Sequence, residues 1–396
     1  MRRPRRSFLP LLVILLPVML VAGIWLGGHP TNLPDPVRDA LVDEGEGQIY
    51  EQAIDTLERD YYRKVDRKQL LNQSLEQAVR SLDDRFSNYF APRDFADFQE
   101  ATEGRFEGVG MTVDKVEQGL KVISVYEGSP AARGGLRPGD VITHVDGRSI
   151  ASASSQESTT KIKGPAGTPV RLTVRSGKAD PRVITLKRAQ VNIPVVRSEM
   201  RRQDGRKIAY ARLAGFTSGA SEELGDAVRE LLDDGAESVV LDLRDNGGGL
   251  LNEAVMISSI FIPDGKIVST KGRSRPTQVY EATGGAIDED VPVVVLVNDR
   301  SASASEIVTG ALQDRKRATV VGTRTFGKGV FQEIEPLPNG GALDITVGEY
   351  FLPSGRNLGG GGVKRGAGVS PDVRAEDDPD TPKRDEALLA ALRQAA

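Results

Sequence analysis

A cluster of serines and one later lysine are the residues whose types and spacing could do chemistry in this chain. Residues 301–306 read Ser-Ala-Ser-Ala-Ser-Glu after an apolar run, and Lys328 follows in the loop-like Thr-Phe-Gly-Lys-Gly of 325–329. The chain has no cysteine, and its two histidines, His29 and His144, lie far upstream. The pattern therefore favours a serine nucleophile at the start of a helix, activated by a lysine.

The serine cluster also has a structural interpretation. Ser303 and Glu306 fit the capping-box pattern, in which a serine caps a helix and a glutamate three residues later reaches back to it. A nucleophile there would gain from the helix dipole, because first-turn amides such as that of Ala304 can face an oxyanion. The glycines of Asp245–Gly249 could supply a second amide, since they need no side-chain room, although they equally fit a strand-to-helix turn.

Lys328 must be separated from a phosphate-binding lysine. Residues 322–329 match Gly-x-x-x-x-Gly-Lys after the strand-like 318–321. The match fails at Gly329, which has no hydroxyl to hold magnesium, and residues 330–334 alternate like a strand where a helix is required. A lysine base must also lose its proton near neutral pH, so burial has to lower its pKa from about 10.4 toward roughly 7–8. An exposed lysine without a role is the ordinary alternative.

The second half of the chain alternates predicted strands and helices. Strands are predicted at 207–213, 238–244 and 291–297, and helices at 218–234, 250–262 and 302–314. The strand at 291–297 is almost continuously apolar, which is typical of a strand inside a sheet. Alternation of this kind implies an α/β fold in which loops at the strand ends carry the chemistry.

Residues 105–190 differ in character and consist of short β-like runs broken by glycine. Together with the run from Gly128 to Asp140, they resemble a PDZ domain of the bacterial protease type. In such domains the backbone N–H groups of one loop receive the C-terminal carboxylate of a peptide, which adds to the sheet as a strand. The resemblance assigns that loop to Val109, Gly110 and Met111.

The amino terminus predicts export. Arg2, Arg3, Arg5 and Arg6 precede an apolar stretch from Phe8 to about Gly27 that is long enough to cross a bilayer as a helix. We expect a single N-terminal membrane pass with the catalytic part on the periplasmic or extracellular side. Secretion after cleavage of a signal peptide is the alternative.

The segment between this stretch and the PDZ-like region is predicted to be a polar linker followed by helices. Helical spacing occurs at 47–61 and 67–82, and Pro92 opens a further short helical pattern. We predict no catalytic cluster in this region, so its default role is packing, a lid or a dimer contact. A net charge of −4 gives no indication of a nucleic-acid surface.

Together, residues 45–375 resemble the carboxyl-terminal processing proteases, tail-specific serine peptidases of the S41 family with a PDZ domain before a crotonase-like (ClpP/crotonase) α/β core. The motifs that carry the resemblance lie in the PDZ-like block and at 82–90, 241–251, 301–307, 325–332 and 348–356. The resemblance implies that Ser303 is the nucleophile, that Lys328 is the general base and that Gln332 orients it. It matches Ala304 and one glycine of 247–249, taken as Gly248, to the oxyanion amides, with Ser301 and Ser305 as neighbouring alternatives for the nucleophile.

Two departures from the family pattern stand out. Gly247 lies where the family usually has proline, and the glycine-rich segment 359–366 is longer than the usual connection. Neither is expected to touch the serine–lysine dyad.

The predicted organisation has six parts. They are an anchor or signal segment at 1–28, a linker at 29–46, a helical region at 47–104, a PDZ domain at 105–190, a serine protease core at 191–375 and a tail or helix at 376–396. We expect an exported serine endopeptidase that takes proteins with exposed C-termini and needs no metal or other cofactor, with oligomeric state left open. The alternative is a non-catalytic PDZ adaptor that delivers C-termini to another protease.

Overall fold

A computed structural model of the chain describes residues 46–364, 367–378, 381 and 384–396. The expected membrane or signal segment and the linker up to residue 45 lie outside the described residues, and Glu46, the last residue of the predicted linker, begins a helix. Over the described ranges, no helix combines the length and the apolar character that a membrane crossing requires. The described residues divide into two compact units, with the boundary between Ala78 and Val79.

The first unit contains the two helices that the sequence predicted upstream. They are α3 (Glu46–Asp60) and α4 (Arg67–Arg80), whose last turn passes into the second unit. Arg67 at the start of α4 pairs with three carboxylates of α3, those of Glu51, Asp55 and Glu58. All four side chains are exposed, so each pair contributes little to stability.

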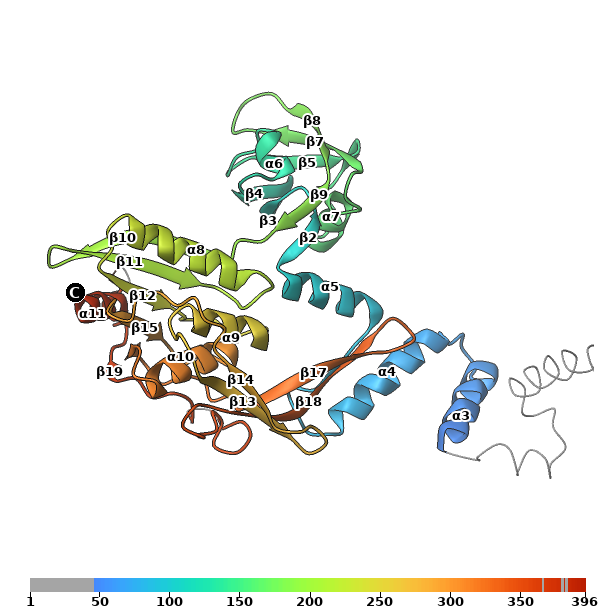
Figure 1. Cartoon of the computed structure of the whole chain (residues 1–396). Coiled ribbons are helices and arrows are strands. Elements are labelled where there is room, and N and C mark those ends of the chain that lie inside the picture. Colours follow the sequence, from blue (N-terminus) through green and yellow to red (C-terminus); the bar gives the residue numbers. More distant parts are fainter. Residues whose placement is uncertain (1–45, 365–366, 379–380, 382–383) are drawn as a thin grey trace, which may run out of the picture. The chain divides into compact units, whose positions relative to one another are not determined.

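In the second unit, a small β-rich part carries its own hydrophobic core (Figure 1). Its elements are β2 (Arg105–Gly108), β3 (Met111–Val116), β4 (Gly119–Val125), α6 (Pro130–Arg133), β5 (Val141–Val145), β6 (Arg148–Ser149), α7 (Ser155–Ile162), β7 (Pro169–Arg175), β8 (Arg182–Lys187) and β9 (Ala189–Asn192). The antiparallel sheet runs β3-β4-β5-β7-β8, with β6 on β5 and a separate β2-β9 pair. Strand β3 therefore lies at an edge, where a peptide could add as a further strand.

The larger part is built on a six-stranded sheet in the order β10-β11-β12-β15-β16-β19. Its strands are β10 (Val196–Gln203), β11 (Arg206–Leu213), β12 (Ser238–Asp242), β15 (Val293–Val297), β16 (Thr319–Gly322) and β19 (Val373–Arg374). The pair β10-β11 is antiparallel, and the remaining pairs are parallel.

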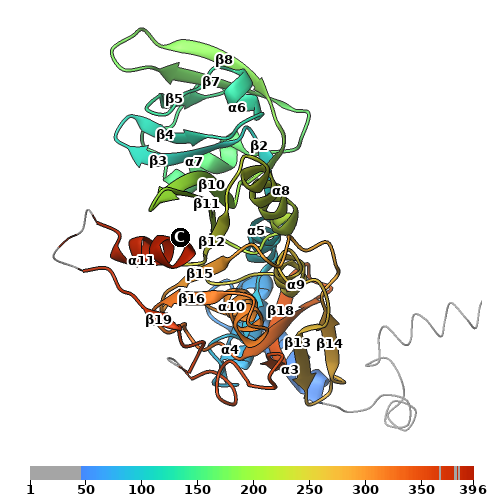
Figure 2. The same cartoon turned by 60° about the vertical axis from the view of Figure 1, so that its left-hand side comes forward.

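Helices cover both faces of this sheet (Figure 2). One face packs against α8 (Ala220–Asp233), α9 (Leu251–Ser259) and α10 (Ala304–Asp314), and the other against α11 (Glu386–Ala395). Every residue of β12 and β15 is buried, which explains the almost continuous apolar run at 291–297. The predicted α/β, ClpP/crotonase-like fold with a PDZ domain is confirmed.

A second sheet carries the strand that follows Lys328. It contains β1 (Asn88–Phe90), β13 (Lys266–Gly272), β14 (Gln278–Glu281), β17 (Val330–Pro336) and β18 (Ala342–Phe351). Strand β18 pairs antiparallel with β17, β13 and β1, and α5 (Pro92–Glu103) follows β1. Because β17 is a strand, the structure agrees with the rejection of the phosphate-loop pattern. Residues from upstream of the PDZ-like part thus share a sheet with residues from far downstream.

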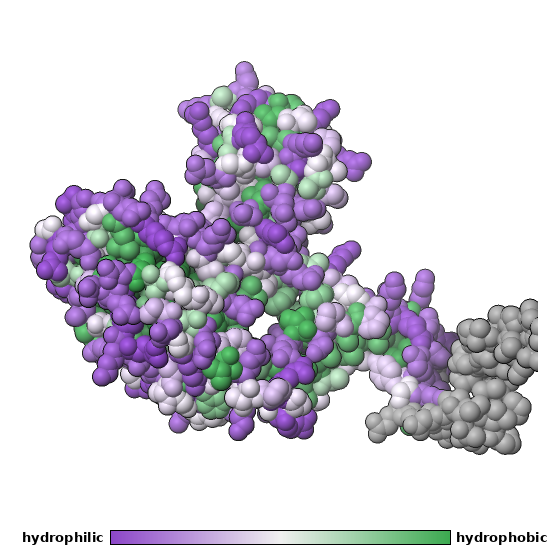
Figure 3. All heavy atoms as spheres, in the orientation of Figure 1, coloured by the Kyte–Doolittle hydropathy of each residue, from purple (hydrophilic) through white to green (hydrophobic). Residues whose placement is uncertain are grey.

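The surface of the second unit is mixed in polarity. In the face shown in Figure 3, hydrophilic side chains cover most of the area and hydrophobic ones appear as separate patches. The exposed large apolar residues on the PDZ-like part are Ile123 and Val183. Scattered apolar residues of this kind are normal for a protein surface and do not mark a site by themselves.

Candidate active site

Ser303 lies at the turn between β15 and α10. Its backbone adopts φ 57° and ψ −115°, a left-handed φ that non-glycine residues rarely adopt, and only 6% of the residue is exposed. Its N–H donates to Glu306 Oε2 at 2.9 Å, which is the carboxylate half of the predicted capping box. The Ser303 hydroxyl opposes the rise that burial gives to the pKa of the Tyr350 phenol, so the strained turn places this hydroxyl beside Tyr350.

The two neighbouring serines have structural partners. Ser301 Oγ donates to the carbonyl of Leu243 at 2.8 Å, and Ser305 Oγ donates to the carbonyl of Asn246 at 2.9 Å. Both serines are fully buried. Their hydroxyls hold the loop after β12 against the start of α10, which leaves Ser303 as the serine of this cluster whose hydroxyl is not committed to the backbone.

Lys328 is partly buried in the loop before β17. Its Nζ donates to Gln332 Oε1 at 2.7 Å and lies 4.8 Å from the centre of the Phe86 ring. Burial lowers the pKa of Lys328, while the carboxylates of Asp344, Asp84 and Glu306 act in the opposite direction. A lowered pKa is what a lysine base requires, because only the neutral amine can accept a proton.

Gln332 on β17 holds this lysine from one side. Since an ammonium group has donors only, the amide oxygen must face Lys328, and Nε2 then donates to Thr346 Oγ1 at 2.9 Å. Within the part of the chain that the structure describes, no hydrogen bond joins Ser303 Oγ to Lys328 Nζ. In structures without substrate, catalytic hydrogen bonds are often long and tighten only when substrate is bound.

Glu306 joins the two sides of the site. Its fully buried carboxylate accepts hydrogen bonds from the N–H of Ser303, the hydroxyl of Thr325 at 2.6 Å, and the N–H groups of Gly327 at 2.7 Å and Lys328 at 2.9 Å. Burial raises the pKa of Glu306, and these four donors oppose the rise. The sequence identified this residue as a helix cap only. The hydrogen bonds that Glu306 accepts from Thr325, Gly327 and Lys328 depend on the position of a loop, which the sequence pattern does not predict.

The glycine loop after β12 lies directly against Ser303. Gly248 has φ 104°, and a Cβ there would lie 2.8 Å from both the Ala302 carbonyl oxygen and Ser303 Cβ. Its N–H donates to Asn246 Oδ1 at 2.9 Å, whereas the Ala304 N–H has no acceptor within the described residues. Both predicted oxyanion residues are thus beside Ser303, but in this arrangement only the amide of Ala304 is unoccupied.

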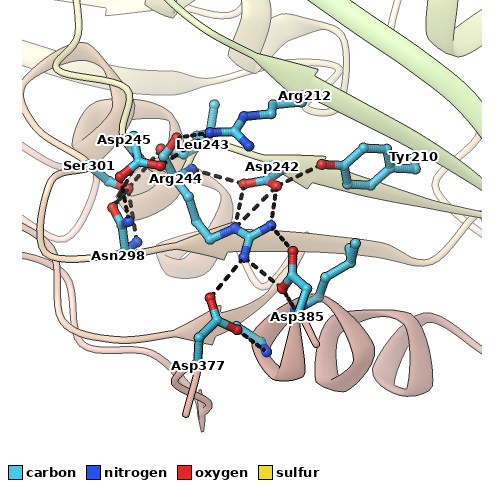
Figure 4. A network of polar contacts seen from close by, with 12 residues as sticks. Tyr210, Arg212, Asp242, Leu243, Arg244, Asp245, Asn298, Ser301, Asp377 and Asp385 are labelled. Carbon is cyan, nitrogen blue, oxygen red and sulfur yellow. Dashed lines mark hydrogen bonds and ion pairs between the residues drawn. The ribbon is translucent and has the colours of Figure 1, made fainter. Parts of the chain in front are cut away.

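A buried ion pair fixes the strand end from which this loop leaves. Figure 4 shows Arg244 between Asp242 and Asp385, each of which it meets at 2.8 Å. Tyr210 donates to the same Asp242 carboxylate at 2.8 Å. Asp385 is also the N-cap of α11, so the last helix is tied to the strand that precedes the glycine loop. Removing one partner of such a buried pair is strongly destabilising.

Two segments that are distant from Lys328 in the sequence lie beside it. The helical region, for which packing was the default role, places its Phe86 ring next to the Lys328 ammonium. The glycine-rich segment was expected not to touch the dyad, and this prediction was wrong, because Val363 forms a β-bridge with Lys328 and Gly329 N–H donates to the Gly362 carbonyl at 3.1 Å. Both contacts join residues far apart in sequence, so local patterns carry no sign of them.

The predicted carboxylate-binding loop lies between β2 and β3. Gly110 has φ 82°, and a Cβ there would lie 2.3 Å from Ser129 Cβ. The loop carbonyls are occupied, because Ala131 N–H donates to Val109 and Ser129 Oγ donates to Gly110. The N–H groups of Val109 and Gly110 find no acceptor in the described part of the chain. Met111 continues from this loop into edge strand β3. The arrangement can therefore receive an anion next to an added strand.

Known proteins resemble this chain along most of its length. A model of peptidase family S41 matches residues 207–375, and a PDZ domain model matches 121–176. A carboxy-terminal-processing protease of Bartonella bacilliformis is 34% identical over 371 residues, which cover 91% of this chain and 82% of that protein. A probable CtpA-like serine protease of Staphylococcus aureus is 36% identical over 84% of this chain and 64% of its own length. A putative S41 protease structure from Bacteroides fragilis is 21% identical and shares the fold, with a TM-score of 0.50 over 85% of this chain and 90% of that one.

Fold and comparisons together define a serine-type peptidase that carries a PDZ domain. The chain belongs to peptidase family S41 and is a carboxy-terminal-processing peptidase of that family. The chain is therefore an enzyme, and the alternative of a non-catalytic PDZ adaptor is rejected.

Proposed function

We propose that this peptidase cleaves proteins from their C-terminal side with a Ser303–Lys328 dyad, after its PDZ domain has bound the terminal carboxylate. The observation that carries the proposal is the buried carboxylate of Glu306. It ties the strained turn of Ser303 to the loop of Lys328, a lysine whose pKa burial has lowered. A nucleophile and a base are thereby built on one hydrogen-bonded support.

The chemistry follows from these groups. Neutral Lys328 takes the proton of the Ser303 hydroxyl while Oγ attacks the peptide carbonyl carbon, and the Ala304 amide receives the oxyanion. Gly248 would add a second donor once its N–H leaves Asn246 Oδ1. The Lys328 ammonium then gives its proton to the leaving amine. A water molecule deprotonated by the same lysine then attacks the acyl carbonyl, the ester bond to Ser303 Oγ breaks, and Lys328 returns the proton to Oγ.

The substrate class rests on the PDZ domain. Two unpaired loop amides and an open edge strand suit a peptide that ends in a free carboxylate. We therefore propose proteins with exposed C-terminal tails as substrates, with apolar tail residues favoured by the family resemblance.

Cleavage of an unfolded protein that ends in an apolar tail tests the dyad. We expect the wild type to cleave it, and Ser303→Ala and Lys328→Ala to leave it intact while the fold, measured by circular dichroism, is retained. Ser218→Ala and Lys271→Ala are matched controls, because both residues are exposed and lie outside the site. Cleavage that survives in both dyad variants would remove the proposed mechanism.

Export is a separate part of the proposal, and it is supported by the arginines and the apolar stretch of residues 1–27. Fractionation of cells that express the full chain should place the peptidase outside the cytoplasm. A variant that lacks residues 1–28 should remain in the cytoplasm. Export of that variant would contradict the assignment.

A further inference from the structure

The turn formed by Asp84, Arg85, Phe86 and Ser87, here called the 84–87 turn, lies against the lysine base although it precedes the PDZ domain in the sequence. The Phe86 ring is 4.8 Å from Lys328 Nζ, and Arg85 lies over the same ring at 4.7 Å. Strand β1 follows this turn directly and pairs with β18, with Asn88 opposite Asp344. The sheet register therefore fixes the turn beside the base.

The turn is held by its own carboxylate. Asp84 accepts hydrogen bonds from Ser87 Oγ at 2.7 Å and from the N–H of Phe86 at 3.0 Å. Ser87 Oγ in turn accepts the N–H of Thr346 on β18 at 3.0 Å. Ser87 is buried and Asp84 is half-buried, so these bonds lie largely out of solvent.

A hydrogen-bond chain with a single direction leads from the base toward this carboxylate. Lys328 donates to the oxygen of the Gln332 amide, and the nitrogen of that amide donates to Thr346 Oγ1. The proton of the Thr346 hydroxyl is then free for an acceptor. Thr346 contributes to the lowered pKa of Asp84, and Ser87 joins the two residues, since its Oγ donates to Asp84 and accepts the N–H of Thr346. Because a carboxylate only accepts, Asp84 as the acceptor of the Thr346 proton would end the chain and set the direction of every bond in it.

We propose that Asp84 is a positioning residue of the active site, which acts through Thr346 to hold the Gln332 amide with its oxygen toward Lys328. The 84–87 turn supplies this residue together with the aromatic ring that covers the lysine. The inference rests on the proposed Ser303–Lys328 dyad and extends it to a segment upstream of the PDZ domain.

Asp84 also belongs to the charge environment of the base. The charged groups that face Lys328 are the carboxylates of Asp344, Asp84 and Glu306 and the guanidinium of Arg85. Burial raises the pKa of Asp84, but its hydrogen bonds from Thr346, Ser87 and Phe86 and the charge of Lys328 hold it below its usual value. Asp84 is thus an anion at neutral pH and favours protonated Lys328. Its neutralisation should let the lysine lose its proton at a lower pH.

The test compares the pH dependence of kcat and kcat/KM for the wild type, Asp84→Asn, Asp83→Asn and Thr346→Val in the full chain. Asp84→Asn removes the charge and keeps a similar shape. We expect its kcat to fall about tenfold, because a loosely held amide misplaces the base, and its acidic limb to move to lower pH. Asp83→Asn is the matched control and should behave like the wild type, since Asp83 is exposed and its φ of 54° suits asparagine.

Thr346→Val breaks the chain and leaves every charge in place. We expect a similar loss of kcat with an unmoved acidic limb, and no further loss of kcat when Asp84→Asn is added. A Thr346→Val variant with the kcat of the wild type would overturn the inference. An Asp84→Asn variant whose kcat and acidic limb both match those of Asp83→Asn would also overturn it.

Two further outcomes are informative. If Asp84→Asn does not fold, as judged by thermal unfolding, the kcat of Thr346→Val decides the question alone. Lys328→Ala separates this inference from the dyad on which it rests. Full activity in Lys328→Ala would remove both, whereas an inactive Lys328→Ala with an unaffected Asp84→Asn and Thr346→Val would remove only the role of Asp84.

Discussion

At the scale of single residues, the site depends on how burial acts on two ionisable groups of opposite charge. Burial disfavours the ammonium form of Lys328 and the carboxylate form of Glu306. The lysine retains hydrogen bonding to one amide oxygen, so it can give up its proton easily. The glutamate receives four donors, so it remains a suitable acceptor in the interior. Lys328 can thus change its protonation state, whereas Glu306 holds the neighbouring backbone in place.

The first prediction concerns the protonation of Lys328. Because a general base must be neutral, kcat/KM should decline as the pH falls through the pKa of Lys328. Burial lowers that pKa, so the decline should begin below the range of an exposed lysine. Lys328→Arg should be inactive at every pH, since a guanidinium does not lose its proton. Lys271→Arg is the control, and an acidic limb near the ordinary lysine value of about 10.4 would contradict the assignment.

The second prediction concerns Glu306. Glu306→Ala leaves four donors without their acceptor, which should lower the free energy of unfolding by about 3 kcal/mol and reduce kcat, because the Ser303 turn and the Lys328 loop lose their common support. Denaturant unfolding and steady-state kinetics measure the two effects. Glu222→Ala, an exposed glutamate in the first turn of α8, should change neither. Equal stability of the two variants would refute the structural role of Glu306.

At the scale of elements, two β-strand ends and the loops that leave them build the site. The glycine loop after β12 is fixed from behind by Arg244 and Asn246, and it presses against the start of α10. The loop before β17 is held by Glu306 and by the glycine-rich segment at 362–363. The site therefore requires close approach of backbone to backbone, which only glycine permits at its tightest point.

The third prediction tests that close approach. Gly248→Ala would place a Cβ 2.8 Å from Ser303 Cβ at a φ of 104°, so we expect kcat to fall about a hundredfold as the oxyanion loop is displaced. Gly247→Ala should retain activity, because a Cβ there meets no atom within 4 Å. Both variants keep the backbone N–H at the substituted position. A difference in kcat between them therefore reports the space available for a Cβ and not the loss of a hydrogen-bond donor. If the two variants have similar kcat values, the loop can accommodate a Cβ at position 248, and the prediction is wrong.

At the scale of the whole molecule, the PDZ domain and the protease core have separate hydrophobic cores. The edge strand and the loop at Gly110 belong to the PDZ core, and Ser303 belongs to the other. Chemistry and recognition of the C-terminus can therefore be altered independently, although both lie in the unit that begins at Val79.

The fourth prediction follows from this separation. A peptide with a C-terminal amide should have a kcat/KM about tenfold lower than the same peptide with a free carboxylate, because a charged hydrogen-bond acceptor is lost. Gly110→Ala, whose Cβ would lie 2.3 Å from Ser129 Cβ, should abolish that preference. Hydrolysis of a small activated ester at Ser303 should be unaffected. Retention of the carboxylate preference by Gly110→Ala would place recognition of the tail elsewhere.

The sequence by itself determined what is local. Apolar periodicity predicted most helices and strands within a few residues, and glycine and proline punctuation marked the turns. The residues around Ser303 and Lys328, with the absence of cysteine, favoured a serine nucleophile with a lysine base, and the resemblance to a family added the peptidase activity. Gly329 and the strand-like alternation after it argued against a phosphate loop. These features depend on neighbours within one element or one turn, so they can be predicted from the sequence alone.

Only the tertiary structure decided which distant groups meet at the site. The pairing of β1 with β18 brings Asp84 and Phe86 to Lys328, and the path of the glycine-rich segment brings Val363 to the same lysine. Hydrogen bonds to distant carbonyls occupy Ser301 and Ser305, and Asn246 occupies the amide of Gly248. Such partners are fixed by strand register and loop closure across the whole chain. Residue type states what a group can donate or accept, but only the fold determines its partner.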